Sequence, residues 1–302
     1  MKKQEQQLST PSVKSTLEGH SRVFLSLRWL IPVFGVSLVL LHWLTDEVKT
    51  NNLLYQVDSL WQIKAFETPY IYVYLHLFTF IPVFSLSFDK KVAYHKNWKT
   101  LFPALLIVAI VFWVWDIWKT AAGVWGFNEK FYTFKFINLP VEEWLFFFTF
   151  PWASVFIYEC LNAYFPKNTF FNKIERLLSI SLIFLLFLIG IVEWGRSYTA
   201  TTSIAAGTVL LWHFLFVENF RGRFYRSFLV GLIPFILVNG ILTGIATEQP
   251  VVIYNPEEYL GIRLITIPLD DFIYNFAMLF SVTMLYEFFK SKNTEGVQKK
   301  FL

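Results

Sequence analysis

The sequence is poor in charged residues and contains a single cysteine. Charged side chains make up 16% of the 302 residues and hydrophobic ones 55%, whereas soluble globular domains carry about 25% charge. So little charge excludes an ordinary soluble domain. Cys160 alone cannot form an internal disulfide or a thiolate metal cluster. The spacing of histidines and cysteines indicates no metal site either.

Eight apolar stretches approach the roughly 20 residues that a helix needs to cross a bilayer. They predict an all-α integral membrane fold of about eight transmembrane helices, with polar tails at 1–21 and 291–302. The first tail lacks the apolar core and cleavage site of a signal peptide, so we expect the first span to be retained. The stretches lie at 22–44, 70–88, 101–118, 144–164, 177–194, 199–217, 226–245 and 268–289.

Positive charge is distributed unevenly between the two sides of such a bundle. Eight spans place both termini on one side, which then collects 18 Lys and Arg against seven on the other, with Arg28 inside a span. Cytoplasmic loops carry this excess in membrane proteins. We therefore expect an integral cell-membrane protein with cytoplasmic termini and with the loops 119–143 and 246–267 on the outer side. The asymmetry explains the net charge of +4 without a nucleic-acid partner.

The two outer loops resemble each other, which indicates an internal repeat. Asp116 precedes the first loop and Asn239 the second, each four residues ahead of a threonine. Each loop then contains an aromatic or β-branched run that ends in asparagine, at Asn128 and Asn255, and a second such run follows. This pattern predicts a small hairpin over the outer face in each loop.

Four spans separate the two copies, so both have the same orientation in the membrane. We therefore expect two repeats of parallel topology, 22–165 and 166–290, related by an axis along the membrane normal. This topology places both copies of the next motif on the outer side.

Each loop closes on a proline, one residue and two acids, directly before an apolar run. The first pair is Glu142 and Glu143, and the second is Asp270 and Asp271. One interpretation is a helix start, in which the Asn or Thr two residues before the proline is the N-cap and the acids face the helix dipole. However, one acid would satisfy the dipole, and ionised groups at the hydrocarbon edge are expensive and usually functional.

Neighbouring residues in a helix point about 100° apart, so the two acids of one pair cannot face the same point. We therefore expect one acid from each copy to share a pocket between the repeats. Which acid donates a proton and which residue accepts one stays open. Arg263, one of few cations in the outer loops, is expected to pair with Asp270 or Asp271.

The doubled acidic motif, the Trp-Asp pair before it and the segment GVWGF resemble the membrane-integral lycopene cyclase domain. Its members include two-chain cyclases of Gram-positive bacteria, haloarchaeal cyclases and the cyclase part of fungal bifunctional enzymes. The resemblance spans roughly residues 70–289, as two repeats fused in one chain. Glutamate is the usual first acid in the family, so Asp270 in the second copy is one methylene shorter.

The resemblance implies an intramolecular lyase or isomerase that closes the acyclic ends of lycopene to rings, with β-ionone rings favoured. An acid protonates the terminal double bond, the next double bond closes onto the cation, and a base removes a ring proton. The catalytic candidates are Glu142, Glu143, Asp270 and Asp271, with Asp116 as the base or as a partner that orients Glu142.

Aromatic faces can stabilise the cation without trapping it. The candidates on the substrate side are Trp115, Trp118, Trp125, Trp144, Asn239 and Tyr274. For any single aromatic residue, however, packing at a membrane interface or between helices is the more common role.

The implied partners are lycopene from the bilayer, membrane lipid and other enzymes that act on carotenoids. No Gly-x-Gly-x-x-Gly follows a strand and opens a helix, so we expect no flavin within the fold. A reduced quinone as an additive stays open.

Several other functions stay open at this point. Within the family these are cyclases of another end group, of the ε or C50 type. Outside it they are a carotenoid-binding protein without catalysis and a proton-coupled transporter. The transporter is disfavoured because the spans lack glycine and proline breaks at mid-membrane.

Overall fold

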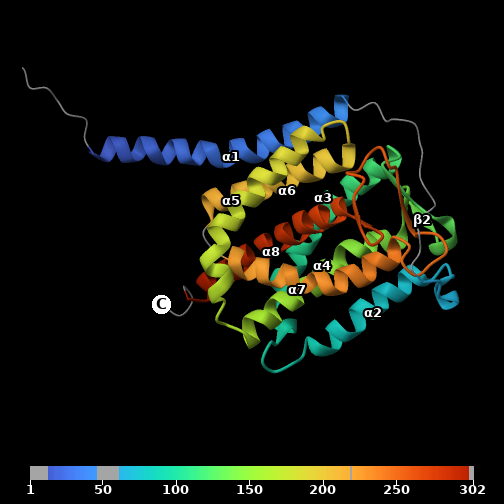
Figure 1. Ribbon diagram of the computed structural model, residues 1–302. Helices are drawn as coiled ribbons and strands as arrows, with labels where there is room; N and C mark the ends of the chain where they lie inside the picture. The colour runs from blue at the N-terminus through green and yellow to red at the C-terminus, as the bar shows by residue number, and fades with distance from the viewer. Residues whose placement is uncertain (1–12, 46–60, 218–219, 299–302) are drawn as a thin grey trace, which may run out of the picture.

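A computed structural model describes residues 13–45, 61–217 and 220–298 of the chain (Figure 1). Within these ranges the chain forms eight α-helices and six short strands. The helices are α1 (Val13–Thr45), α2 (Ile71–Leu86), α3 (Trp98–Ala121), α4 (Val141–Tyr164), α5 (Thr169–Val192), α6 (Ser197–Phe216), α7 (Arg221–Leu242) and α8 (Leu269–Gln298). The strands are β1 (Trp125–Phe127), β2 (Lys135–Phe136), β3 (Leu139–Pro140), β4 (Val252–Tyr254), β5 (Arg263–Leu264) and β6 (Ile267–Pro268).

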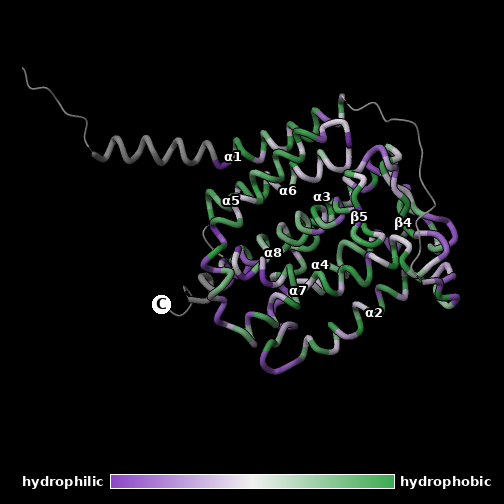
Figure 2. The backbone as a smooth tube through the Cα atoms, viewed as in Figure 1, coloured by the Kyte–Doolittle hydropathy of each residue, from purple (hydrophilic) through white to green (hydrophobic). Residues whose placement is uncertain are grey.

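Seven of these described helices are long and apolar enough to cross a membrane. The remaining one, α2, is also apolar, and its 16 residues extend about 24 Å at 1.5 Å per residue. Figure 2 shows apolar residues along the middle of the helices and hydrophilic residues mainly in the connections at both ends. The expected all-α integral membrane fold is confirmed.

The even-numbered helices α2 to α8 begin at the end of the bundle that carries the strands (Figure 1). We call it the motif end, because the acidic pairs occupy the first turns of α4 and α8. Of the expected tails, 1–12 and 299–302 lie outside the described residues. The described parts of both tails are helical, since α1 begins at Val13 and α8 continues to Gln298.

A pseudo-twofold axis relates the helices α2, α3 and α4 to α6, α7 and α8. β1 and β4 form an antiparallel pair in which Gly126 lies opposite Ile253. These two residues precede Asn128 and Asn255 by the same number of positions, so they are equivalent in the two repeats. Equivalent residues that face each other mark the position of a twofold axis.

The hydrogen bonds that flank this ladder obey the same symmetry. The amide of Asn128 donates to the carbonyl of Val251 at 2.9 Å, and the amide of Asn255 donates to the carbonyl of Val124 at 3.0 Å. Exchanging the two loops turns one bond into the other. The two motif-end loops are therefore joined to each other through equivalent backbone groups.

This exchange corrects the expected pairing of the loops. Each loop does contain a short hairpin, β2 with β3 in the first and β5 with β6 in the second. The first run of each loop, however, pairs with the first run of the other loop and not with its own second run. The sequence of one loop cannot indicate the pairing of β1 with β4, because this pairing forms only where the two repeats come together.

Asn138 and Thr266, the two residues that would be N-caps in the helix-start interpretation of the motif, do not cap α4 and α8. Ile137 and Asn138 have φ values of 47° and 63°, as a two-residue type I′ hairpin turn requires. α4 follows Pro140 without a side-chain cap. The Thr266 hydroxyl lies 2.8 Å from that of Thr243 instead. A capping role therefore does not explain the motif.

The centre of the bundle is formed by α4 and α8. α2, α3 and α7 pack against α4, while α3, α6 and α7 pack against α8. α1 packs along α6, and α5 packs against α6 and α7, so these two helices lie outside the symmetric units. The symmetric units are thus shorter than the expected repeats 22–165 and 166–290. This arrangement holds the first turns of α4 and α8 inside the protein, between the two units.

Candidate active site

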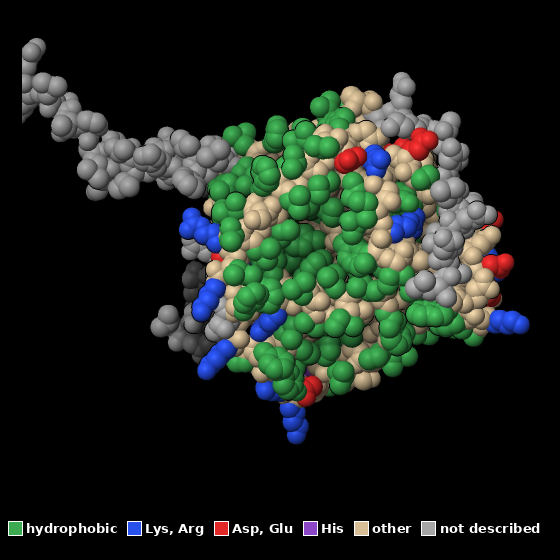
Figure 3. Space-filling model, viewed as in Figure 1, with side chains coloured by type: hydrophobic (Ala, Val, Ile, Leu, Met, Phe, Trp, Pro, Cys, Tyr) green, Lys and Arg blue, Asp and Glu red, His purple; other side chains and the backbone are tan. Residues whose placement is uncertain are grey.

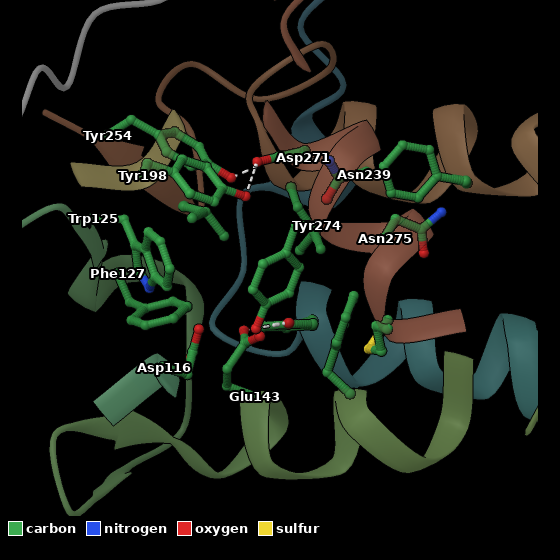
Figure 4. A pocket seen from close by; sticks show the side chains of 16 residues that line it. Asp116, Trp125, Phe127, Glu143, Tyr198, Asn239, Tyr254, Asp271, Tyr274 and Asn275 are labelled. Carbon is green, nitrogen blue, oxygen red and sulfur yellow. Dashed lines mark hydrogen bonds between the residues drawn. The ribbon is translucent and has the colours of Figure 1, made fainter. Parts of the chain in front are cut away.

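A cavity lies between the two repeats at the motif end (Figure 4). Side chains of α2, α3 and α4 from the first repeat, of α6, α7 and α8 from the second, and of β1 and β4 line it. Three carboxyl groups face it, from Asp116 of α3, Glu143 of α4 and Asp271 of α8. The structure thus brings one acid of each motif into one cavity and adds a third.

The first acid of each motif lies away from this cavity. Glu142 accepts hydrogen bonds from the amide of Thr133 at 3.1 Å and from its hydroxyl at 2.8 Å. Asp270 accepts hydrogen bonds from the Thr199 hydroxyl and from the amide of Leu260. Both carboxyls are fully buried. Each one therefore attaches its preceding loop to a helix start, while the rotation of about 100° per residue turns the second acid toward the cavity.

The Asp271 carboxylate is surrounded by hydrogen-bond donors (Figure 4). It accepts from the Tyr198 hydroxyl at 2.7 Å, the Tyr254 hydroxyl at 2.8 Å and the Asn239 amide at 2.7 Å. Burial and the nearby Asp271 charge raise the pKa of Tyr254 well above its ordinary value of 10.0, so its hydroxyl stays a donor. Hydrogen bonds to an ionised acceptor are about twice as strong as neutral ones. This half of the cavity is therefore built for a fixed negative charge.

The acids of the first repeat are held less completely. Glu143 accepts one hydrogen bond, from the Tyr72 hydroxyl at 2.5 Å. The Oδ2 atom of Asp116 and the hydroxyl of Tyr274 have no hydrogen-bond partner within the described ranges. Figure 4 shows Asp116 and Glu143 on the side of the cavity opposite Asp271, with the Tyr274 hydroxyl directed toward Glu143. Buried polar atoms without partners are rare in folded proteins and call for an explanation.

Aromatic rings form much of the remaining wall. Trp125 packs edge-on against Tyr198 with ring centroids 4.8 Å apart, and against Tyr274 at 6.2 Å. Tyr198 stacks on Tyr254 with an interplanar angle of 10°. A group in the cavity therefore lies between ring faces and carboxyl groups, and none of the described residues that line it is a lysine or arginine.

Arg263 does not form the ion pair expected with the acids of the second motif. Its guanidinium lies over the rings of Tyr254 and Tyr259, at 5.4 and 5.0 Å from their centroids. It also donates to the Tyr259 hydroxyl and to the carbonyl of Thr266. The cation thus supports the aromatic wall from outside, and Asp271 is balanced by neutral donors.

The structure brings about half of the predicted site residues to the cavity. Trp115 and Trp118 pack behind the wall with ring centroids 6.2 Å apart, and Trp144 packs on Trp113. The predicted residues that line the cavity are Asp116, Trp125, Glu143, Asn239, Asp271 and Tyr274. Those that do not are Glu142, Asp270, Trp115, Trp118 and Trp144.

Sequence reasoning missed the three tyrosines that donate to the acids. Tyr72 and Tyr198 occupy equivalent places near the starts of α2 and α6 and bond Glu143 and Asp271. Tyr254 directly precedes Asn255, where the first repeat has Phe127. Aligning the first helices of the two symmetric units would have revealed the first two, but their partners depend on tertiary contacts.

Two segments of the chain, residues 69–161 and 195–289, match the family model described as Lycopene cyclase. They correspond to the symmetric units α2 to α4 and α6 to α8, and each contains one acidic pair. No curated protein and no solved structure matches the chain. Since the two segments cover more than half of its length, the chain belongs to the lycopene cyclase family.

Proposed function

We propose that the protein is a lycopene β-cyclase, an isomerase that converts the acyclic ends of lycopene to β-ionone rings without net redox change. Membership of the family establishes a carotenoid cyclase in general terms. The main support for the proposal is the cavity, in which a loosely held carboxyl pair and a tightly held carboxylate face each other across aromatic walls. Such a site can donate a proton to the substrate, stabilise the resulting cation and accept a proton from it.

Glu143 is the proposed proton donor. Its O–H bond breaks as a new C–H bond forms at the terminal double bond of lycopene, which leaves a tertiary cation on the substrate. The Tyr72 hydroxyl, 2.5 Å from Glu143 Oε2, stabilises the carboxylate that remains. A hydrogen bond that strengthens as charge develops lowers the barrier and not merely the energy of the bound substrate.

The cation then undergoes ring closure. The next double bond of the substrate attacks it, a carbon–carbon bond forms, and the positive charge moves into the ring. The faces of Trp125 and Tyr198 stabilise this charge without forming a bond to it. The Asp271 carboxylate adds a fixed countercharge, and its three hydrogen bonds keep its lone pairs from attacking the cation.

Asp116 is the proposed base. Its Oδ2 atom accepts no hydrogen bond from the described residues, so it is available to take the ring proton. The ring C–H bond breaks and its electrons form the new ring double bond. Asp116 then returns the proton to Glu143 on the same side of the cavity. One proton enters and one leaves, so the product is an isomer and the site is restored.

We also propose that the substrate comes from the bilayer and that the motif end faces the outside of the cell, with both termini in the cytoplasm. Figure 3 shows lysine and arginine side chains gathered at the end near the C-terminus, opposite the motif end. Cytoplasmic ends of membrane proteins carry this excess of positive charge. Contacts with membrane lipid and with other enzymes of carotenoid synthesis belong to the same proposal.

The direct test is pigment analysis of a lycopene-accumulating host that expresses the wild-type chain or Glu143→Gln. We expect β-carotene from the wild type and a loss of at least about 100-fold in the variant, the usual contribution of a general acid. The amount of protein in the membrane fraction controls for expression. Unchanged lycopene beside a folded wild-type protein would overturn the proposal, and an ε-ring product would overturn its ring type.

A further inference from the structure

A second cavity lies beside the first, between α2, α4 and α7. It begins at the residues that it shares with the candidate active site, Phe146, Phe235, Asn239 and Asn275. From there it follows α4 as far as Ile157, a distance of about 16 Å at 1.5 Å per residue. The two cavities together thus provide a reaction chamber and an elongated extension of it.

We infer that this second cavity, which we call the tail groove, holds the polyene chain behind the reacting end of the substrate. The inference rests on the proposed function, which supplies the substrate class. Of the residues that the structure describes, none that lines the groove is ionisable, and most of the lining is apolar. The hydroxyl of Ser154, one of the few polar groups in the groove, donates to the carbonyl of Phe150 in its own helix. A long hydrocarbon is the chemistry that such a lining accepts.

Gly231 of α7 borders open space in the groove. A Cβ atom added to this residue would meet no heavy atom within 4 Å. Glycine is unfavourable in the interior of a helix because it costs backbone entropy and buries no side chain. Its place in the middle of α7 therefore leaves room that neighbouring side chains do not fill.

The other repeat has no such space at the equivalent positions. Gly231 lies eight residues before Asn239, and Val108 lies eight residues before Asp116. Val108 is only 4% exposed and belongs to the main hydrophobic core. Val282, the counterpart of Ser154, is fully buried in the same core.

The groove therefore breaks the twofold symmetry of the protein. The site accepts one substrate end, with the chain on the α7 side, in a single orientation. The other end of the same lycopene molecule can reach Glu143 only after the substrate has left and bound again in reverse. We expect the product with one ring to appear free in the membrane before the product with two rings.

The test uses full-length protein in lipid nanodiscs and two readouts. Gly231→Leu fills the groove, Gly231→Ala leaves most of it open, and Ser154→Leu fills it from the opposite wall. Lycopene binding is measured from the visible absorption of the bound polyene in a Glu143→Gln background, where turnover is expected to be at least about 100-fold slower. Conversion is measured separately with Glu143 present, as a time course of one-ring and two-ring products.

We expect Gly231→Leu and Ser154→Leu each to weaken binding and slow conversion at least tenfold, and Gly231→Ala, which adds a single methyl group, to have a smaller effect than Gly231→Leu on both readouts. The thermal unfolding midpoint identifies a variant that fails to fold, and the other leucine variant then decides. Wild-type binding and conversion in both leucine variants would overturn the inference, as would two-ring product without free one-ring product. Weaker binding in these variants beside a wild type that does not convert lycopene would support the groove and overturn the proposed function.

Discussion

Asn239 donates a 2.7 Å hydrogen bond to Asp271, whereas Asp116, at the equivalent position of the first repeat, adds a second carboxyl on the side of Glu143. The scaffold around the cavity is close to symmetric, yet the chemistry of its two halves differs. One half fixes a carboxylate with three donors, and the other holds two carboxyls with few donors. Fusion of two repeats in one chain permits this division of roles, since each position can differ between the copies.

Replacing Asp271 by Asn tests the fixed countercharge. The amide keeps the size of the side chain but removes the negative charge that faces the substrate cation. Loss of one preorganised electrostatic group typically costs about 10²–10³ in kcat, and we expect a loss in this range with little change in KM. Initial rates of the purified protein in nanodiscs measure both constants. An unchanged kcat would exclude Asp271 from stabilisation of the cation.

Replacing Asp116 by Asn tests the base. The amide nitrogen cannot accept the ring proton, so ring closure can occur while the proton stays on the substrate. We expect kcat to fall by about 10²–10⁴, the range of a general base. Products that have lost a proton from a different carbon, or that have captured water, would be visible by mass spectrometry. A variant with a wild-type rate and product would assign the deprotonation to another group.

Much of the fold could be predicted from the sequence. The apolar stretches indicate the helices because length and hydrophobicity alone decide whether a segment crosses a bilayer. The doubled motif also predicted a pocket shared by the two repeats, because the order of the spans determines the side of the membrane on which each motif lies. The two acids of the first motif, Glu142 and Glu143, are adjacent in the sequence and equally polar. Only the rotation of α4 relative to its neighbours decides that Glu142 binds the preceding loop and that Glu143 faces the cavity.

The hydrogen-bond partners of the acids could not be predicted. Tyr72 reaches Glu143 across 71 positions of the chain, and Tyr198 reaches Asp271 across 73. Neither tyrosine differs in its local sequence from the many aromatic residues that are exposed on the surface of the bundle. The tail groove could not be predicted either, because the open space beside Gly231 depends on how the residues of α2 and α4 pack around it.

Two equivalent tyrosine–glutamate hydrogen bonds between α4 and α8 are expected to stabilise the bundle. The Tyr158 hydroxyl donates to Glu287 at 2.6 Å, and its counterpart Tyr286 donates to Glu159 at 2.8 Å. These bonds join α4 to α8 at the end opposite the cavity, and a hydrogen bond to a charged group contributes about 1.5–3 kcal/mol. We expect Tyr158→Phe and Tyr286→Phe each to lower the free energy of unfolding by about that amount.

The same two variants should leave catalysis unchanged. Glu159 lies 16 residues along α4 from Glu143, or about 24 Å at 1.5 Å per residue. Thermal unfolding in detergent and initial rates below the unfolding range separate the two effects. A variant that unfolds like the wild type but loses activity would show that this pair belongs to the reaction and not to the packing of α4 on α8.

The Glu67 carboxylate predicts a pH-dependent contribution to stability at the motif end. It lies before α2, accepts a 2.6 Å hydrogen bond from the amide of Glu248 and forms a 2.5 Å ion pair with Lys130. Burial alone would raise the pKa of Glu67, but the hydrogen bonds from Lys130 and the Glu248 amide lower it below its ordinary value of 4.5. The folded form therefore binds this proton more weakly than the unfolded chain.

A carboxyl with a lowered folded pKa contributes stability above its unfolded pKa and loses it as the pH falls through the folded value. We expect Glu67→Gln to unfold at a lower temperature than the wild type at about pH 7, by an amount that corresponds to about 0.2–1 kcal/mol for an exposed pair. The difference should shrink toward zero near about pH 3. Glu129→Gln, an exposed acid in the loop that holds Lys130, serves as the matched control. A difference that persists unchanged at low pH would mean that Glu67 acts through its shape and not through its charge.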